Sequence, residues 1–154
     1  MTYLTNPFPK LQGEETTTPR LADRVYSKFK AEIDVKVGYF IARGSASDIV
    51  KNPNNVNDEI LGFIPHISAY EDKTIKAGMQ VPHVLIHMIA YLHCQPTANV
   101  SRGDQVYIDI SNADLTKIGF LTNVATNNLL VKGIFFDNDS LANEPNTFTY
   151  NSAK

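Results

Sequence analysis

The sequence predicts a mainly β protein: a compact antiparallel β-barrel or sandwich, jelly-roll-like, with an extended N-terminal arm and at most one short helix. Three observations predict this class. Short apolar runs rich in Val, Ile, Phe and Tyr are bounded by turn residues at short intervals. No segment sustains the 3.6-residue apolar period of a long helix. The connections are too short for the crossover helices of a parallel sheet, so the strand pairing should be mainly antiparallel.

Residues 19–34, PRLADRVYSKFKAEID, are the best helix candidate. Pro19 suits the first turn of a helix, but Leu21, Val25 and Phe29 give only a thin apolar stripe. The segment is therefore either helical or already strand in its second half.

Beyond residue 34 the pattern predicts strands separated by polar loops. The loop SASDIVKNPNNVNDE contains the turn cluster Asn52–Asn55, and the loop YEDKTIKAGMQ contains a turn at Ala77–Gly78. A further turn is expected near Asn112. The expected strands are 35–44, 59–68, 81–94, 105–111, 118–123 and 129–138.

Length and charge exclude several classes of protein. The chain has 154 residues and a net charge of −2, with 19% charged residues, which fits one domain without a strongly basic surface for nucleic acid. No apolar run approaches the roughly 20 residues that span a bilayer, and the N-terminus has no apolar signal region. We therefore expect a soluble protein that binds neither nucleic acid nor membrane.

The stretch VPHVLIHMIAYLHC, residues 81–94, holds three of the four histidines and the single cysteine. Read as a strand, it has one apolar face and one mixed face, and its length predicts a bend or bulge near Met88–Ala90. His83 and His87 would then lie about 13 Å apart, too far to share a zinc ion. Read as a helix it lacks the Glu of a HExxH site. We expect structural histidines, including His93, and a buried, inert thiol at Cys94.

No catalytic or cofactor motif is present. The chain lacks the glycine-rich phosphate loops and the GxSxG elbow, and DNDS (137–140) lacks the glycine and glutamate of a calcium loop. The adjacent acidic pairs lie in polar loops, with nothing to bring them together in a cleft. We therefore expect no enzyme, cofactor or metal.

The first 24 residues form a separate unit. Prolines at positions 7, 9 and 19 exclude a continuous helix, yet large apolar residues recur, unlike in an ordinary disordered tail. The pattern predicts an extended arm over 1–24 that docks on another surface, and the alternative is a floppy terminus without a binding role. A β-rich domain over 25–140 follows, and then a C-terminal tail over 141–154 with Phe148 and Tyr150 among polar residues. The arm residues expected to bind are Tyr3, Leu4, Phe8 and Leu11.

Several short motifs within residues 35–137 together resemble the tailed-bacteriophage head decoration, or structural cement, proteins. They include the two glycine-containing strands Ile60-Leu61-Gly62-Phe63 and Val131-Lys132-Gly133-Ile134-Phe135. The most specific is Arg102-Gly103-Asp104-Gln105-Val106-Tyr107-Ile108-Asp109, in which a tight turn at Gly103–Asp104 leads into an alternating strand.

This resemblance implies a non-enzymatic protein, made in the host cytoplasm, that binds the outer surface of the phage capsid. Its partners would be the major capsid protein and copies of itself, as a dimer or trimer on the shell. An arm strand from Tyr3–Leu11 would add to a sheet of a capsid subunit or a sister copy. The alternative is a small β-barrel enzyme or ligand-binding domain, metal-dependent through His83, His87 and His93.

Overall fold

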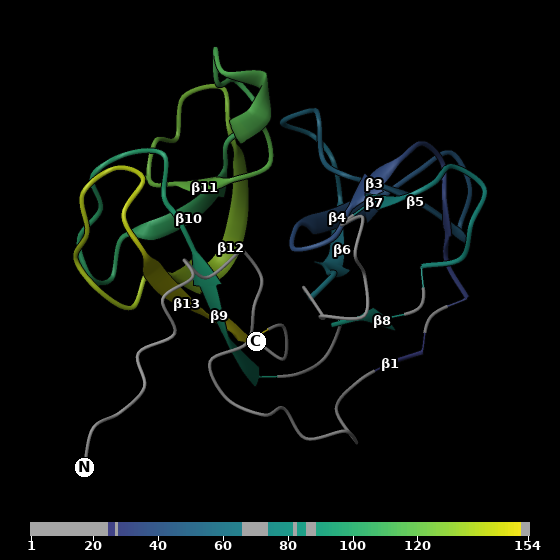
Figure 1. The fold of residues 1–154 in the computed structure, drawn as a ribbon, viewed down its shortest axis with the longest axis horizontal. Helices are drawn as coiled ribbons and strands as arrows, with labels where there is room; N and C mark the ends of the chain where they lie inside the picture. The colour runs from purple at the N-terminus through teal and green to yellow at the C-terminus, as the bar shows by residue number, and fades with distance from the viewer. Residues whose placement is uncertain (1–24, 27, 66–73, 82, 86–88, 152–154) are drawn as a thin grey trace.

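The protein is mainly β, as predicted (Figure 1). The computed structural model describes residues 25–151 apart from 27, 66–73, 82 and 86–88. Within these residues the one helical element is the 3₁₀ turn η2, Leu115–Lys117, and the rest of the regular structure is strand.

The N-terminal half of the chain forms three small sheets, on the right of Figure 1. A four-stranded sheet has the order β2-β5-β4-β6, and two two-stranded sheets pair β3 with β7 and β1 with β8. The strands are β1 (Val25–Tyr26), β2 (Lys30–Ala31), β3 (Val35–Lys36), β4 (Phe40–Arg43), β5 (Ile49–Lys51), β6 (Ile60–Phe63), β7 (Thr74–Ile75) and β8 (His83–Val84).

The C-terminal half forms two sheets, on the left of Figure 1. One has the order β11-β10-β12, and the other pairs β13 with β9. An isolated antiparallel bridge between Phe136 and Phe148 connects them. The strands are β9 (Ile89–Cys94), β10 (Gln105–Ile108), β11 (Leu121–Thr122), β12 (Leu129–Phe135) and β13 (Asn146–Asn151).

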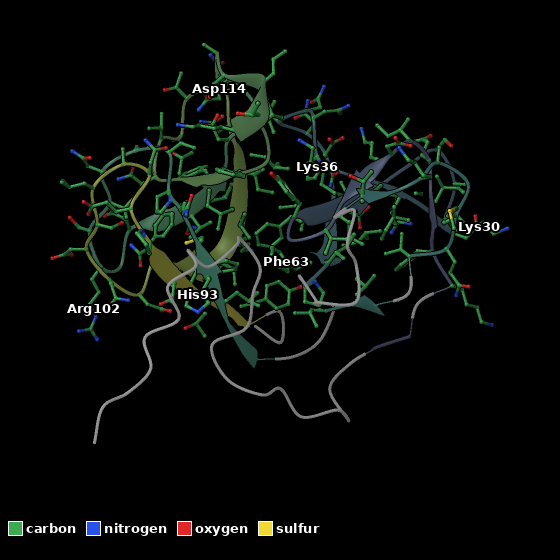
Figure 2. The ribbon with its side chains drawn as sticks, viewed as in Figure 1. Lys30, Lys36, Phe63, His93, Arg102 and Asp114 are labelled. Atoms are coloured by element: carbon green, nitrogen blue, oxygen red, sulfur yellow. The ribbon has the colours of Figure 1, made fainter. Side chains whose placement is uncertain are left out.

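The two halves share a hydrophobic core. Phe40 and Phe63 of the first half are fully buried, and their rings pack against the ring of Phe148 from β13 at centroid distances of 6.0 and 5.7 Å. Figure 2 places Phe63 where the halves meet. In a second contact between the halves, the Tyr39 ring lies so close to Gly119 that a Cβ at position 119 would collide with it. These contacts make one packed sandwich of sheets, and the described strands do not close into a barrel.

The structure decides one open alternative, corrects one local expectation and adds one parallel pair to a mainly antiparallel fold. Within 19–34, the described residues form β1 and β2, the strand alternative, because their backbones pair with the distant strands β8 and β5. The polar loop after residue 44 contains β5, which the sequence pattern missed. β5 pairs with β2 in parallel, an exception to the antiparallel rule that needs no crossover helix because β4 connects back across the same sheet.

The histidine stretch divides between two sheets. β8 pairs with β1, whereas β9 pairs with β13 over six residue pairs. The division precedes Ile89, beside the bend expected near Met88–Ala90, although Met88 itself lies outside the described residues.

Part of the segment assigned to a C-terminal tail is a strand. Residues 146–151 form β13, with Phe148 and Tyr150 buried and the Tyr150 hydroxyl donating to the Leu85 carbonyl at 2.9 Å. These buried contacts make the strand part of the folded domain. No helix in the described part of the chain is long and apolar enough to cross a membrane.

Candidate docking surface

A bulge in β12 determines which of its side chains face outward. Tyr107 of β10 pairs with Leu130 and Gln105 pairs with Phe135, so β10 advances two residues while β12 advances five. Side chains of a regular strand alternate, so the three extra residues invert the phase of β12. Ile134 therefore points into the core, 2% exposed, and Phe135 points outward.

Two residues hold the bulge in place. Gly133 has φ +77°, a left-handed conformation that side chains with a Cβ rarely adopt, and no atom lies within 4 Å of where its Cβ would be. The Gln105 side-chain amide donates to the carbonyls of Val131 at 2.7 Å and Ile134 at 2.8 Å. These carbonyls lie where the ladder is interrupted, so Gln105 replaces the backbone donors that a regular partner strand would supply.

The outward residues of the β10–β12 pair form a surface that we call the outer strip: Tyr107, Leu130, Lys132 and Phe135. Leu130 is 45% exposed and Phe135 is 48% exposed. Tyr107 lies directly opposite Leu130, so the two side chains share one face of the sheet. An outward Leu and Phe on one strand are unusual for a solvated face, which normally carries polar residues. The strip is thus a candidate for binding an apolar partner.

A polar hollow of about 270 Å³ lies at one end of the same sheet, where β10 and β11 end and β12 begins. Its main polar group is the Asp109 carboxylate, 6% exposed, which accepts hydrogen bonds from Thr97 Oγ1 at 2.7 Å and Asn112 Nδ2 at 2.9 Å. Asn128 accepts from the Ile110 N–H and from Ser111 Oγ. These groups bind one another and fix the loop that leads to η2, so the hollow serves the fold.

Among the histidines and the cysteine, the structure describes the side chains of His93 and Cys94, both on β9. His93 is half-buried on β9 (Figure 2), and the His83 side chain and all of His87 lie outside what the structure describes. Cys94 is 2% exposed, and burial, with a smaller contribution from Asp137, raises the pKa of its thiol well above the usual range. The burial expected from the sequence is confirmed, and the raised pKa favours an unreactive thiol.

No three His, Cys, Asp or Glu side chains converge to hold a metal ion in the described part of the chain. The arm residues Tyr3, Leu4, Phe8 and Leu11 all fall in 1–24, outside the described residues. Their role as binding residues therefore stays a prediction. The outer strip is the feature that sequence reasoning missed as a site, although the run LLVKGIFF carried its signal in apolar residues at both odd and even positions.

The fold is a β-sandwich, and its described residues show an exposed apolar strip and no group of three side chains that could hold a metal ion. Comparison with solved structures finds a similar fold in a phage capsid. A chain in the capsid of Myoviridae phage XM1 has a TM-score of 0.64 at 17% identity, and the match covers 100% of both chains. The head fiber gp8.5 N base of bacteriophage phi29 has a TM-score of 0.49 at 11% identity, covering 85% of this chain and 95% of that one, a likeness too weak to support an argument.

No family model and no curated protein matches the sequence. The likeness to the XM1 chain is one of fold, because 17% identity is too low to carry residue roles between proteins. At that level the resemblance to phage head proteins, first suggested by short motifs, is confirmed over the whole chain.

Proposed function

We propose that this protein is a structural component of a phage head that decorates the outer surface of the capsid and stabilises it. The observation that carries the proposal is the whole-length fold match to a chain of the XM1 capsid. The described sandwich fits this role because decoration needs a stable scaffold and broad contacts rather than a pocket. The role requires no catalysis, cofactor or metal.

The binding element in this proposal is the arm, residues 1–24. Tyr3, Leu4, Phe8 and Leu11 supply large apolar side chains that gain by leaving water, about 1.5–3 kcal/mol for each fully buried side chain. Ordering the backbone costs about 1–2 kcal/mol per residue, so the gain must come from a surface that buries most of the arm. In this proposal the arm finds such a surface on the assembled head, from major capsid protein subunits and neighbouring copies together, and repetition over the shell multiplies weak contacts into stable attachment.

The test is stoichiometric binding to heads that lack the protein, measured by cosedimentation. The full-length chain should bind, and deletion of residues 1–18 should weaken or abolish binding while the domain stays folded by circular dichroism. A full-length variant with Tyr3, Leu4, Phe8 and Leu11 replaced by Ser should match the deletion. A control with Thr16–Thr18 replaced by Ser should bind normally. If the deleted protein decorates heads as tightly as the full chain, the arm is not the binding element.

A further inference from the structure

We propose that the outer strip is the receptor for the N-terminal arm of a neighbouring copy, so that residues 3–11 of one chain pack on Leu130 and Phe135 of the next. This inference rests on the proposed function for the arm as a docking element, and it specifies the surface that the arm meets.

The size of the strip favours an extended segment over a second globular domain. An aromatic side chain offers about 150–250 Å². With Phe135 at 48% and Leu130 at 45% exposed, the two side chains together leave about 200 Å² of apolar surface in water. A stable interface between two folded proteins buries about 800 Å² on each partner. The strip alone is therefore too small for a dimer interface, whereas it suits a narrow peptide with two or three anchoring side chains.

The chain itself contains a segment of this chemistry. Residues 3–11, YLTNPFPKL, hold four large apolar residues and no acidic one. Pro7 and Pro9 lack backbone N–H groups, so this part of the arm is a poor partner for the edge of a sheet. In place of the strand addition that the resemblance implied, this proposal has the arm pack flat against a sheet face, where side chains make the contact. That geometry matches the outer strip, which presents side chains rather than backbone.

The arm is long enough to reach beyond its own domain. The 17 residues from Phe8 to Val25 span at most about 55–60 Å when extended. A folded domain of this size is about 35–40 Å across. The arm joins the described chain at β1, in the half of the molecule that does not carry the strip (Figure 1). A neighbour's strip is thus within range, and each docked arm would connect two copies on the shell.

Crosslinking between single-cysteine variants tests this contact. Phe8→Cys in one protein and Phe135→Cys in another are mixed and oxidised, first free in solution and then on decorated heads. A bond between these two introduced cysteines can only join two chains. The natural Cys94 is buried and should not form crosslinks. A mixture of the Phe8→Cys variant with wild type measures any crosslinking through Cys94. Lys30→Cys is the matched control, because Lys30 is exposed on the opposite side of the molecule (Figure 2).

A covalent pair formed severalfold faster with Phe135→Cys than with Lys30→Cys, and likewise with Leu130→Cys, would support the proposal. Equal rates at the strip and at Lys30, or no covalent pair in solution and on heads, would overturn it. A chain carrying both Phe8→Cys and Phe135→Cys tests for a contact within one copy. If the disulfide forms only inside this chain and not between single-cysteine variants, the arm docks on its own copy and the proposed contact between copies is wrong. The crosslink is scored separately from head binding. A crosslinked protein that fails to bind heads would refute the proposed function alone, and bound protein without crosslinks would refute this inference alone.

Discussion

Two glycines in similar strand motifs should respond to substitution in opposite ways. Gly62 in β6 is surrounded: a Cβ there would lie 2.5 Å from the Leu85 carbonyl oxygen and 2.8 Å from Val84 Cγ1. Gly133 in β12 is open, with nothing within 4 Å, but its φ of +77° is strained for other residues. We therefore expect Gly62 to be required for space and Gly133 for backbone conformation.

The magnitudes follow from these two causes. At Gly62, overpacking costs about 1–3 kcal/mol, and the lower entropy of the unfolded alanine variant offsets about 0.4–1 kcal/mol of that. Gly62→Ala should therefore lose about 1–2 kcal/mol of unfolding free energy, and Gly62→Asn more. At Gly133, the left-handed backbone costs alanine about 1–2 kcal/mol. Asparagine tolerates that region, as Asn127 and Asn143 do here at φ 58° and 65°, so Gly133→Asn should cost less than Gly133→Ala.

Urea unfolding followed by circular dichroism gives the four free energies by linear extrapolation. The test is which of the Ala and Asn variants has the lower unfolding free energy at each site. This ranking does not depend on the extrapolation to zero urea. The reasoning is refuted if Asn is the milder substitution at both sites or the harsher at both, or if Gly62→Ala is as stable as the wild type.

Two further predictions concern titrating groups. Burial alone would raise the pKa of Asp58, but N–H donation from Asn54 and Asn55 and the ion pair with Lys51 outweigh it and hold that pKa below the ordinary value. The ionised Asp58 thus stabilises the fold above its unfolded-state pKa of about 4, and the contribution is lost as pH falls through the lower folded-state pKa. The stability difference between wild type and Asp58→Asn, measured by urea unfolding, should shrink from pH 7 to pH 3, and a constant difference would contradict the assignment. The raised pKa and burial of Cys94 predict that a thiol reagent at pH 7 labels it no faster than the chain opens, and rapid stoichiometric labelling of the folded protein would disprove this.

The local features that the sequence determined are those that depend on a few neighbouring residues. The turns at Gly78 and Gly103 have φ of +81° and +87°, as glycine at these positions predicted. The Asp104 side chain closes the second turn by accepting from the Ser101 N–H at 2.9 Å. β10 alternates between core and surface as its sequence does. In each case the residues that determine the local conformation lie within four positions of one another in the sequence.

Other features were decided by contacts between distant parts of the chain. β5 lies in a polar loop, and its strand conformation depends on partners in β2 and β4. β13 resembles a polar tail in sequence, but its six pairs with β9 bury Phe148 and Tyr150. Neither pairing could be deduced from composition, because the partner strands lie far away along the chain.

By itself, then, the sequence determined the strand-rich class, the main turns and the burial of its one thiol, since each follows from local conformational preference or apolar character. Only the tertiary structure decided the outward direction of Phe135. Alternation predicts a side chain's face only while the strand stays in phase, and the β12 bulge, held by Gly133 and Gln105, inverts that phase. The outer strip exists because of that inversion.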